Sequence, residues 1–265
     1  MHSIRAKALD EFSRRTGRAV PAIAKTFWGA PMHVLYPASH AAALYRYGFV
    51  EEAVTAFFLQ RLRPGDTAID VGAHFGYFSL LASALVGPAG RVVAFEPSPR
   101  TFAILSSNAK RPSNIRCVRA AVFSRAGRAS FRDFGDTFST LNSLFSPRFE
   151  ANVPHPPSAE TYDVETVALG TFCRTNGLAP DFVKIDAESA ELPILRGMEA
   201  ILRRKKPDLC VEVGDLGVPG VAESRKTIHH LLARGYRALE CKDGKFVAHT
   251  LQRRYEPGNL FFVAR

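Results

Sequence analysis

The sequence has no long hydrophobic run and few cysteines. No apolar stretch approaches the roughly 18 residues that a membrane-spanning helix needs, and Phe78–Val86 is short enough to predict a buried helix. The 4 cysteines lie far apart and include no Cys-x-x-Cys pair, which excludes the spacing of a zinc ribbon. Dispersed cysteines of this kind indicate reduced, buried thiols in a cytoplasmic protein.

The first residues also lack the pattern of a secretory signal. Basic side chains are scattered along a polar, amphipathic segment, and no apolar core follows them. The scattered residues are Arg5, Lys7, Arg14, Arg15 and Arg18. We therefore expect a cytoplasmic protein with no membrane span.

Acidic residues are outnumbered, because 35 Lys and Arg against 25 Asp and Glu give a net charge of +10. Such a charge fits binding to nucleic acid, to an anionic membrane surface or to an anionic substrate, and equally fits a well-solvated surface. The one basic cluster, Arg203–Lys206, precedes Pro207 at the expected end of a helix, where cations interact favourably with the helix dipole. We therefore do not expect nucleic acid to be the main partner.

From residue 67 onward, short apolar strands alternate with helices. This alternation predicts an α/β fold, a doubly wound and mainly parallel sheet of seven strands with helices on both faces. The expected strands are 67–71, 91–95, 115–118, 182–185, 209–213, 236–240 and 260–263, and the expected helices are 52–62, 75–86, 97–109, 191–202 and 224–234.

Two segments depart from this alternation. Residues 1–62 are expected to form an N-terminal helical and irregular extension that precedes the domain at 63–265. Residues 124–162 are rich in Ser, Phe, Arg, Gly and Pro and predict an irregular insertion. The insertion is expected to hold two short antiparallel strands, at 129–134 and 162–168.

The first candidate site is the loop Asp70–Gly76, which follows a strand and opens a helix. Gly72 permits a tight turn and the close approach of a ligand to the backbone. Amide groups at the start of a helix favour a carboxylate or a phosphate. Because Ala73 and His74 fill the middle, the loop is not Gly-x-Gly-x-x-Gly, and by itself it could be an ordinary strand-to-helix turn.

A second feature strengthens the first. Glu96 ends the next strand, 24 positions after Gly72. Rossmann-like folds place a carboxylate at this position on the hydroxyls of a ribose, which suits free 2′ and 3′ hydroxyls and disfavours a 2′-phosphate. The alternative is a solvated glutamate at a strand end.

Acidic residues gather after the expected strand 182–185, where Lys184 is followed by Asp186, Glu188 and Glu191. Ligands of open α/β sheets lie at this edge. The carboxylates could serve as a general base, hold a substrate hydroxyl or bind a metal ion. Alternatively, the two glutamates stabilise a helix dipole and Lys184 neutralises one of them. Because the spacing sets no coordination geometry, we assign no metal ligands.

Together these motifs resemble the FkbM family of S-adenosylmethionine (SAM) dependent methyltransferases. The resemblance covers residues 60–265 and depends on the order and spacing of the motifs. The sequence departs from the family pattern at Ser189, where glycine is usual, and at His74, where asparagine is common. The matching stretches are Asp70–Leu80, Val93–Pro99, Lys184–Glu188, Ala190-Glu191 and Leu195–Gly197, and Glu212 matches a late acidic strand.

The resemblance implies a class I SAM-methyltransferase fold, SAM as methyl donor and O-methylation of a sugar, glycan, polyketide or other natural product. It implies that Asp70 and Gly72 bind the methionine part of SAM, that Glu96 binds the ribose, and that Ala121 lies near the adenine. It also places a loop at 140–144 near the cofactor. The cofactor-binding residues expected in full are Asp70, Gly72, Ala73, His74, Phe75, Gly76, Glu96, Pro97, Ser98 and Ala121.

For catalysis we predict that Asp186 is the base or the substrate anchor, supported by Glu188. His74 is an alternative base, because imidazole changes its charge near neutral pH. Glu191 and Glu212 are expected to bind the acceptor, a small molecule or a glycan. The sequence is compatible with a monomer and with a homodimer.

Three other functions are compatible with parts of the sequence. A nicotinamide-dependent oxidoreductase would have a more complete glycine triplet and a Tyr-Lys or His proton donor, and neither is evident. The Asn/Asp-Pro-Pro-aromatic motif of enzymes that methylate base amino groups is absent, whereas RNA ribose methylation stays open. A non-catalytic module would use the basic surface and would bind nucleic acid in a salt-dependent way.

Overall fold

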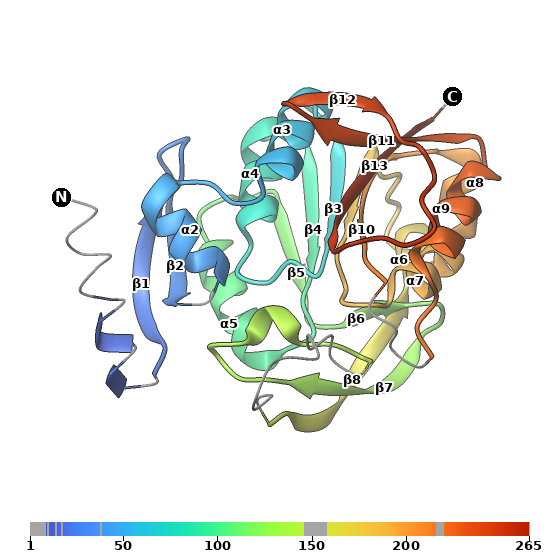
Figure 1. Ribbon diagram of the computed structural model, residues 1–265. Helices are drawn as coiled ribbons and strands as arrows, with labels where there is room; N and C mark the ends of the chain where they lie inside the picture. The colour runs from blue at the N-terminus through green and yellow to red at the C-terminus, as the bar shows by residue number, and fades with distance from the viewer. Residues whose placement is uncertain are drawn as a thin grey trace.

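The computed structural model of the chain describes residues 9, 11–13, 15, 16, 18–37, 39–145, 158–215 and 220–264. Its centre is a mixed eight-stranded sheet (Figure 1). The strands are β3 (Thr67–Val71), β4 (Arg91–Phe95), β5 (Ile115–Val118), β9 (Phe182–Ile185), β10 (Asp208–Val213), β11 (Tyr236–Lys242), β12 (Lys245–Ala248) and β13 (Gly258–Ala264). They follow the order β12-β11-β13-β10-β9-β3-β4-β5.

The seven expected strands all lie in this sheet, which contains one further strand that was not expected. Strands β3, β4, β5, β9 and β10 pair in parallel, whereas β13 is antiparallel to both β10 and β11. The eighth strand, β12, folds back on β11 across Asp243 and Gly244, whose φ angles are 48° and 71°. Two consecutive positive φ angles are typical of the tight turn of a hairpin.

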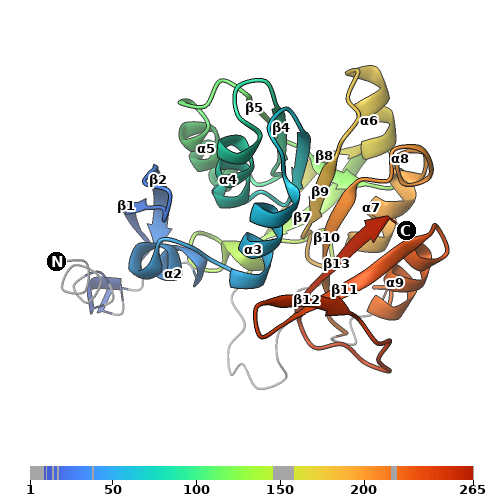
Figure 2. The ribbon, with the colours of Figure 1, turned by 90° about the horizontal axis from the view of Figure 1, so that it is seen from above.

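Helices cover both faces of the sheet, as the alternation predicts (Figure 2). On one face lie α3, α4 and α5; on the other lie α6, α7, α8 and α9. The bounds are α3 (Glu52–Arg61), α4 (Tyr77–Val86), α5 (Pro99–Asn108), α6 (Leu169–Thr175), α7 (Glu191–Gly197), α8 (Glu199–Arg204) and α9 (Ser224–Leu232). No helix of the described residues is both long and apolar enough to cross a membrane.

The expectation of a single helix at 191–202 is wrong, because this segment forms two separate helices, α7 and α8. Met198 leaves the helical conformation, with φ −117° and ψ 22°. At the end of α7 the chain passes close to the strand β6 (Ala121–Phe123), so that a Cβ on Gly197 would lie 2.5 Å from the carbonyl oxygen of Phe123. This contact explains why a glycine stands where the helix is interrupted.

The expectation of a helical and irregular extension over residues 1–62 is also wrong. Residues 20–36 form an antiparallel hairpin of β1 (Val20–Lys25) and β2 (Pro31–Tyr36), followed by α2 (Ser39–Tyr47). In β2, Met32, Val34 and Tyr36 alternate with less buried residues, which is the period of a strand with one face covered. Phe57 and Phe58 of α3 pack on Phe182 in the core of the sheet.

Asn108 at the end of α5 connects the hairpin to the rest of the fold. Its side chain accepts a hydrogen bond from the His33 amide at 2.7 Å and donates to the His33 carbonyl at 2.9 Å. It also donates to the Phe75 carbonyl at 2.8 Å, in the loop after β3. A single buried amide thereby holds β2 against the expected cofactor loop.

The expected insertion contains both predicted antiparallel strands, β7 (Gly127–Asp133) and β8 (Glu160–Ala168). A third strand, β6 (Ala121–Phe123), pairs in parallel with β8, so that the three form a small second sheet in the order β6-β8-β7. A short 3-10 helix, Ser139–Leu141, follows β7. Residues 146–157 of the expected insertion lie outside the described residues.

Candidate functional site

A pocket of about 330 Å³ opens at the carboxyl ends of β3, β4 and β9. The loop after β3, the end of β4 and the residues after β9 form one wall. Residues 139–144 contribute a second wall, and the segment from β2 to Glu51 contributes a third. Ligands bind at this edge in open α/β sheets, so the pocket lies at the edge where the sheet topology predicts a ligand site.

The loop after β3 passes directly against the end of β9. Gly72 has a φ of +73°, and a Cβ on it would lie only 1.8 Å from the carbonyl oxygen of Asp186. The amides of Gly72 and Ala73 donate to the Phe95 carbonyl at 3.1 and 2.9 Å, which ties the loop to β4 as well. Only glycine fits this point, because the backbone is left-handed and no space is left for a side chain.

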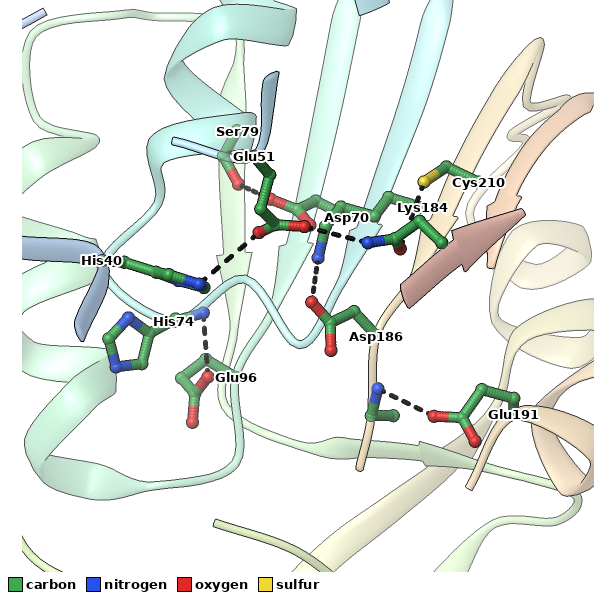
Figure 3. Close-up of polar contacts among 12 residues, drawn as sticks. His40, Glu51, Asp70, His74, Ser79, Glu96, Lys184, Asp186, Glu191 and Cys210 are labelled. Atoms are coloured by element: carbon green, nitrogen blue, oxygen red, sulfur yellow. Dashed lines mark hydrogen bonds and ion pairs between the residues drawn. The ribbon is translucent and has the colours of Figure 1, made fainter. Parts of the chain in front are cut away.

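Glu96 connects the loops that follow β3 and β4. Its Oε2 accepts from the His74 amide at 3.0 Å (Figure 3), and its Oε1 accepts from the Ser98 amide at 2.9 Å. Burial raises the pKa of Glu96 to about 7, although the two backbone hydrogen bonds oppose the shift. The carboxyl group lines the pocket, where a ribose could reach it.

His74 adopts φ +51° in the same loop, and its Nε2 lies 2.8 Å from Ser139 Oγ. Burial, with a smaller contribution from the neighbouring His40, lowers the pKa of His74 to about 3. An imidazole with this pKa stays neutral near pH 7 and takes up protons poorly. The geometry therefore favours a hydrogen-bonding role for His74 over the alternative role of base.

Lys184 pairs with Asp186, whereas the sequence interpretation paired it with one of the two glutamates. Its Nζ lies 2.8 Å from Asp186 Oδ2, and its side chain is only 3% exposed. Burial raises the pKa of Asp186, but the charge and hydrogen bond of Lys184, with smaller contributions from His40 and Glu212, together leave the pKa below its ordinary value. Asp186 is therefore a charged hydrogen-bond acceptor and a weak base.

Asp70 lies behind the loop, 2% exposed and outside the pocket wall. Its Oδ2 accepts from Ser79 Oγ at 2.6 Å, while its Oδ1 has no hydrogen-bond partner among the described residues. Burial raises the pKa of Asp70, against the opposing charge of Lys184. Its position therefore supports the loop and the lysine from behind.

Glu191 lies at the start of α7, and its Oε1 accepts from the amides of Ala187 and Ser189 at 3.2 Å each. Glu188 and Ser189 have φ angles of 48° and 89°, so the usual glycine of the family would be less strained at position 189. Glu191 therefore stabilises the turn beside the pocket and does not line the pocket itself.

The pocket wall includes most of the predicted site residues and omits four of them. Glu188 and Glu212 reach it together with Asp186, and one oxygen from each carboxylate lies within 4.8 Å of the others, close enough to share a cation. The predicted residues in the wall are Gly72, Ala73, His74, Phe75, Glu96, Pro97, Ala121, Asp186, Glu188 and Glu212. Those outside it are Asp70, Gly76, Ser98 and Glu191.

Sequence reasoning missed several polar residues of the wall, among them His40, Glu51, Asn142 and Asn259. His40 and Glu51 enter from the N-terminal segment, and Asn259 of β13 donates to Glu51 Oε2 at 3.0 Å. Asn142 accepts from the Phe134 amide at 2.7 Å, and its Nδ2 is buried with no hydrogen-bond partner in the described part of the chain. The available signal for Asn142 was its place in the expected loop 140–144; the other three belong to no motif.

Comparison with known proteins finds similarity to methyltransferases. The family model described as "Methyltransferase FkbM domain" matches residues 70–238. The chain is 32% identical over 186 residues to the 31-O-demethyl-FK506 methyltransferase FkbM of Streptomyces tacrolimicus, covering 61% of this chain and 70% of that protein. It is 29% identical over 156 residues to the hexuronic acid methyltransferase AglP of Haloferax volcanii, covering 58% of each.

Among solved structures, the chain is similar to the methyltransferase FkbM from Methylobacillus flagellatus KT. The sequence identity is 14% and the TM-score 0.45, over 84% of this chain and 54% of that one.

Proposed function

Because the chain belongs to the FkbM family of methyltransferases, we propose that it O-methylates a hydroxyl group of a sugar, polyketide or other natural product. The chain is a SAM-dependent methyltransferase, and SAM is the methyl donor. The single observation that carries the proposal is the arrangement of Gly72 and the buried Glu96 on one pocket wall, at the carboxyl ends of adjacent parallel strands.

The residues present fit SAM. The Glu96 carboxylate faces the pocket, and each of its oxygens accepts one backbone amide and keeps capacity for a ribose hydroxyl. The unpartnered Asn142 Nδ2 is a buried donor on the second wall of the same pocket. Gly72 lines the pocket beside them and lets the loop pass directly against the end of β9.

When bound, SAM supplies a methyl group that its sulfonium already activates. What remains for the protein is to align the acceptor oxygen, to exclude water and to receive the hydroxyl proton. The Asp186 carboxylate, which Lys184 keeps charged, suits a neighbouring hydroxyl of the acceptor, which would donate a hydrogen bond to it and orient the reacting oxygen. Glu188 and Glu212 lie beside Asp186 and are proposed to support the acceptor.

The acceptor class comes from the two relatives. One is named for a methyl group on the polyketide FK506 and the other for a hexuronic acid, so a hydroxyl on a polyketide or a sugar is the shared chemistry. We propose this class for the present chain, together with a small-molecule or glycan partner.

Isothermal titration calorimetry with SAM and with NAD tests the donor. We expect binding of SAM and no binding of NAD. Transfer of labelled methyl from SAM to 31-O-demethyl-FK506, to a hexuronic acid glycoside and to neutral glycosides tests the acceptor, with a short RNA in a parallel reaction. Label found in the RNA alone would contradict the proposal.

Glu96 should make SAM binding depend on pH. Ribose hydroxyls donate to the ionised carboxylate, so SAM must displace the proton at low pH. We therefore expect the wild-type dissociation constant to increase about tenfold per pH unit below pH 7 and to be constant above it.

A Glu96→Gln variant should bind SAM about tenfold more weakly at pH 8, because it loses a charged acceptor. It should also lose the pH dependence between 5 and 7. Calorimetry over this range checks both results, and Glu165→Gln, at an exposed position of β8, is the control. A steep dependence that persists in Glu96→Gln would assign it to another group.

A further inference from the structure

A histidine and a glutamate of the pocket come from outside the segment that the family model matches. His40 lies on α2 and Glu51 in the turn before α3, whereas the match begins at residue 70. His40 Nε2 lies 3.7 Å from Glu51 Oε1. The side chains are 43% and 20% exposed, so the imidazole is accessible and the carboxylate is mostly covered.

Glu51 is held in place from several sides. Its Oε2 accepts from Asn259 Nδ2 at 3.0 Å, and its carboxylate lies between His40 and Lys184 (Figure 3). Its backbone is left-handed, with φ 43° and ψ 72°, yet its side chain makes no hydrogen bond that would cap α3. A strained non-glycine residue at a pocket wall is typical of a functional constraint.

The two bases that the sequence suggested, His74 and Asp186, are poor proton acceptors. His74 has a pKa of about 3, and Asp186 has a lowered pKa and is bound to Lys184. A general base works best when its pKa lies near the working pH, and imidazole is the side chain that changes charge there. His40 combines an imidazole, access to the pocket and a carboxylate partner.

Charged or titratable groups face His40 from three elements. Glu51 approaches from the turn before α3, and the His74 ring lies 6.4 Å away, edge to face, from the loop after β3. Asp186, which follows β9, lies within electrostatic reach of His40, and Lys184 is its ion-pair partner.

We propose that His40, oriented by Glu51, is the base that takes the proton from the acceptor hydroxyl; this inference rests on the proposed O-methylation. As the acceptor oxygen bonds to the methyl carbon, the bond from that carbon to sulfur breaks, and its electron pair stays on the sulfur. The hydroxyl proton moves to the unprotonated nitrogen of His40. The Glu51 carboxylate then stabilises the imidazolium until the proton passes to solvent.

The test compares His40→Gln with the wild-type chain in labelled-methyl transfer from saturating SAM to 31-O-demethyl-FK506 and to a hexuronic acid glycoside. We expect the variant to lose about 100-fold or more in rate. The wild-type rate should rise with pH to a plateau, and this rise should be absent from the variant. By calorimetry, SAM affinity should stay within about twofold, because His40 lies on the acceptor side.

Two further variants separate catalysis from structure. His40→Ala should regain part of its rate when free imidazole is added, which a merely structural role would not allow. Glu51→Gln should shift the rise in rate to lower pH, because the imidazolium loses its anionic partner. His33→Gln is the matched control, since His33 is an exposed histidine of β2 outside the pocket wall.

The possible outcomes distinguish a failure of the base assignment from a failure of the proposed O-methylation. If the wild-type chain transfers label and His40→Gln does so at the same rate and with the same pH profile, the base assignment is overturned and the function stands. If the wild-type chain methylates none of the acceptors, the proposed function is overturned and the base assignment falls with it.

Discussion

Gly72→Ala should abolish SAM binding and lower the free energy of unfolding by about 3–5 kcal/mol. The new Cβ would lie 1.8 Å from the Asp186 carbonyl oxygen, an overlap that no side-chain rotation relieves because both atoms belong to backbone segments. The loop after β3 and the end of β9 would have to separate. Because the loop and the end of β9 both line the pocket, their separation would disrupt the SAM site. It would also destabilise the centre of the sheet.

Alanine substitutions at two other glycines distinguish the cost of the steric clash from the cost of a positive φ. Gly177 has φ +63° with no atom within 4 Å of an added Cβ, so Gly177→Ala should cost only about 1 kcal/mol. Gly76 has φ +92°, and its added Cβ would meet the flexible end of Leu105 at 2.6 Å, which predicts an intermediate loss. Urea unfolding and calorimetry with SAM measure both effects. Equal losses for Gly72→Ala and Gly177→Ala would show that the close approach to Asp186 does not matter.

Lys184→Met should cost about 3–5 kcal/mol of stability, as expected when a buried ion pair loses one partner. The ammonium group interacts electrostatically with three carboxylates, those of Asp186, Asp70 and Glu51. Burial of Lys184 lowers its pKa, but these three anions together hold the pKa above the ordinary value, so the lysine is charged. Without it, three negative groups remain at the base of the pocket.

The pH dependence of Lys184→Met has a defined sign. Burial already raises the pKa values of Asp70 and Glu51, and losing the cation raises them further. A carboxyl whose folded pKa exceeds its unfolded pKa stabilises the fold at low pH and loses this contribution as pH rises. The variant should therefore be closest to the wild type in acid and weakest above neutrality.

Thermal unfolding between pH 5 and 8 checks this result. Adding Asp186→Asn to Lys184→Met removes one of the three anions and should recover part of the stability. Lys205→Met is the control, because Lys205 pairs with Asp181 at the surface, where an ion pair contributes about 0–1 kcal/mol. A Lys184→Met loss no larger than that of Lys205→Met would mean that the three carboxylates do not depend on this cation.

Motifs that are local in the chain could be predicted, because their chemistry is contained in one strand and the turn after it. The loop after β3 and Glu96 are of this kind. The pairing of Lys184 with Asp186 was also within reach, since side chains two apart along an extended segment point to the same side. The hairpin at 20–36 was missed although Pro31–Tyr36 has the period of a strand, because the run is short.

The rest of the site depends on contacts that no local pattern encodes. Glu51 is fixed by Asn259, 208 positions later in the chain, and His40 reaches the pocket only because the hairpin and α2 pack against the sheet. No periodicity or spacing marks such a pair before folding. The depressed pKa values of His74 and Asp186 likewise arise from burial and from neighbours that only the folded chain supplies.

The attachment of β2 through Asn108 has a consequence for how the enzyme can diversify. The residues proposed to hold the donor begin at position 70, whereas the hairpin, α2 and the His40–Glu51 pair precede it. The pocket therefore combines residues of the matched segment, among them Asp186, Glu188 and Glu212, with a wall supplied by residues that precede that segment. We expect substitutions in this preceding wall to change the preference for the acceptor more than the affinity for SAM.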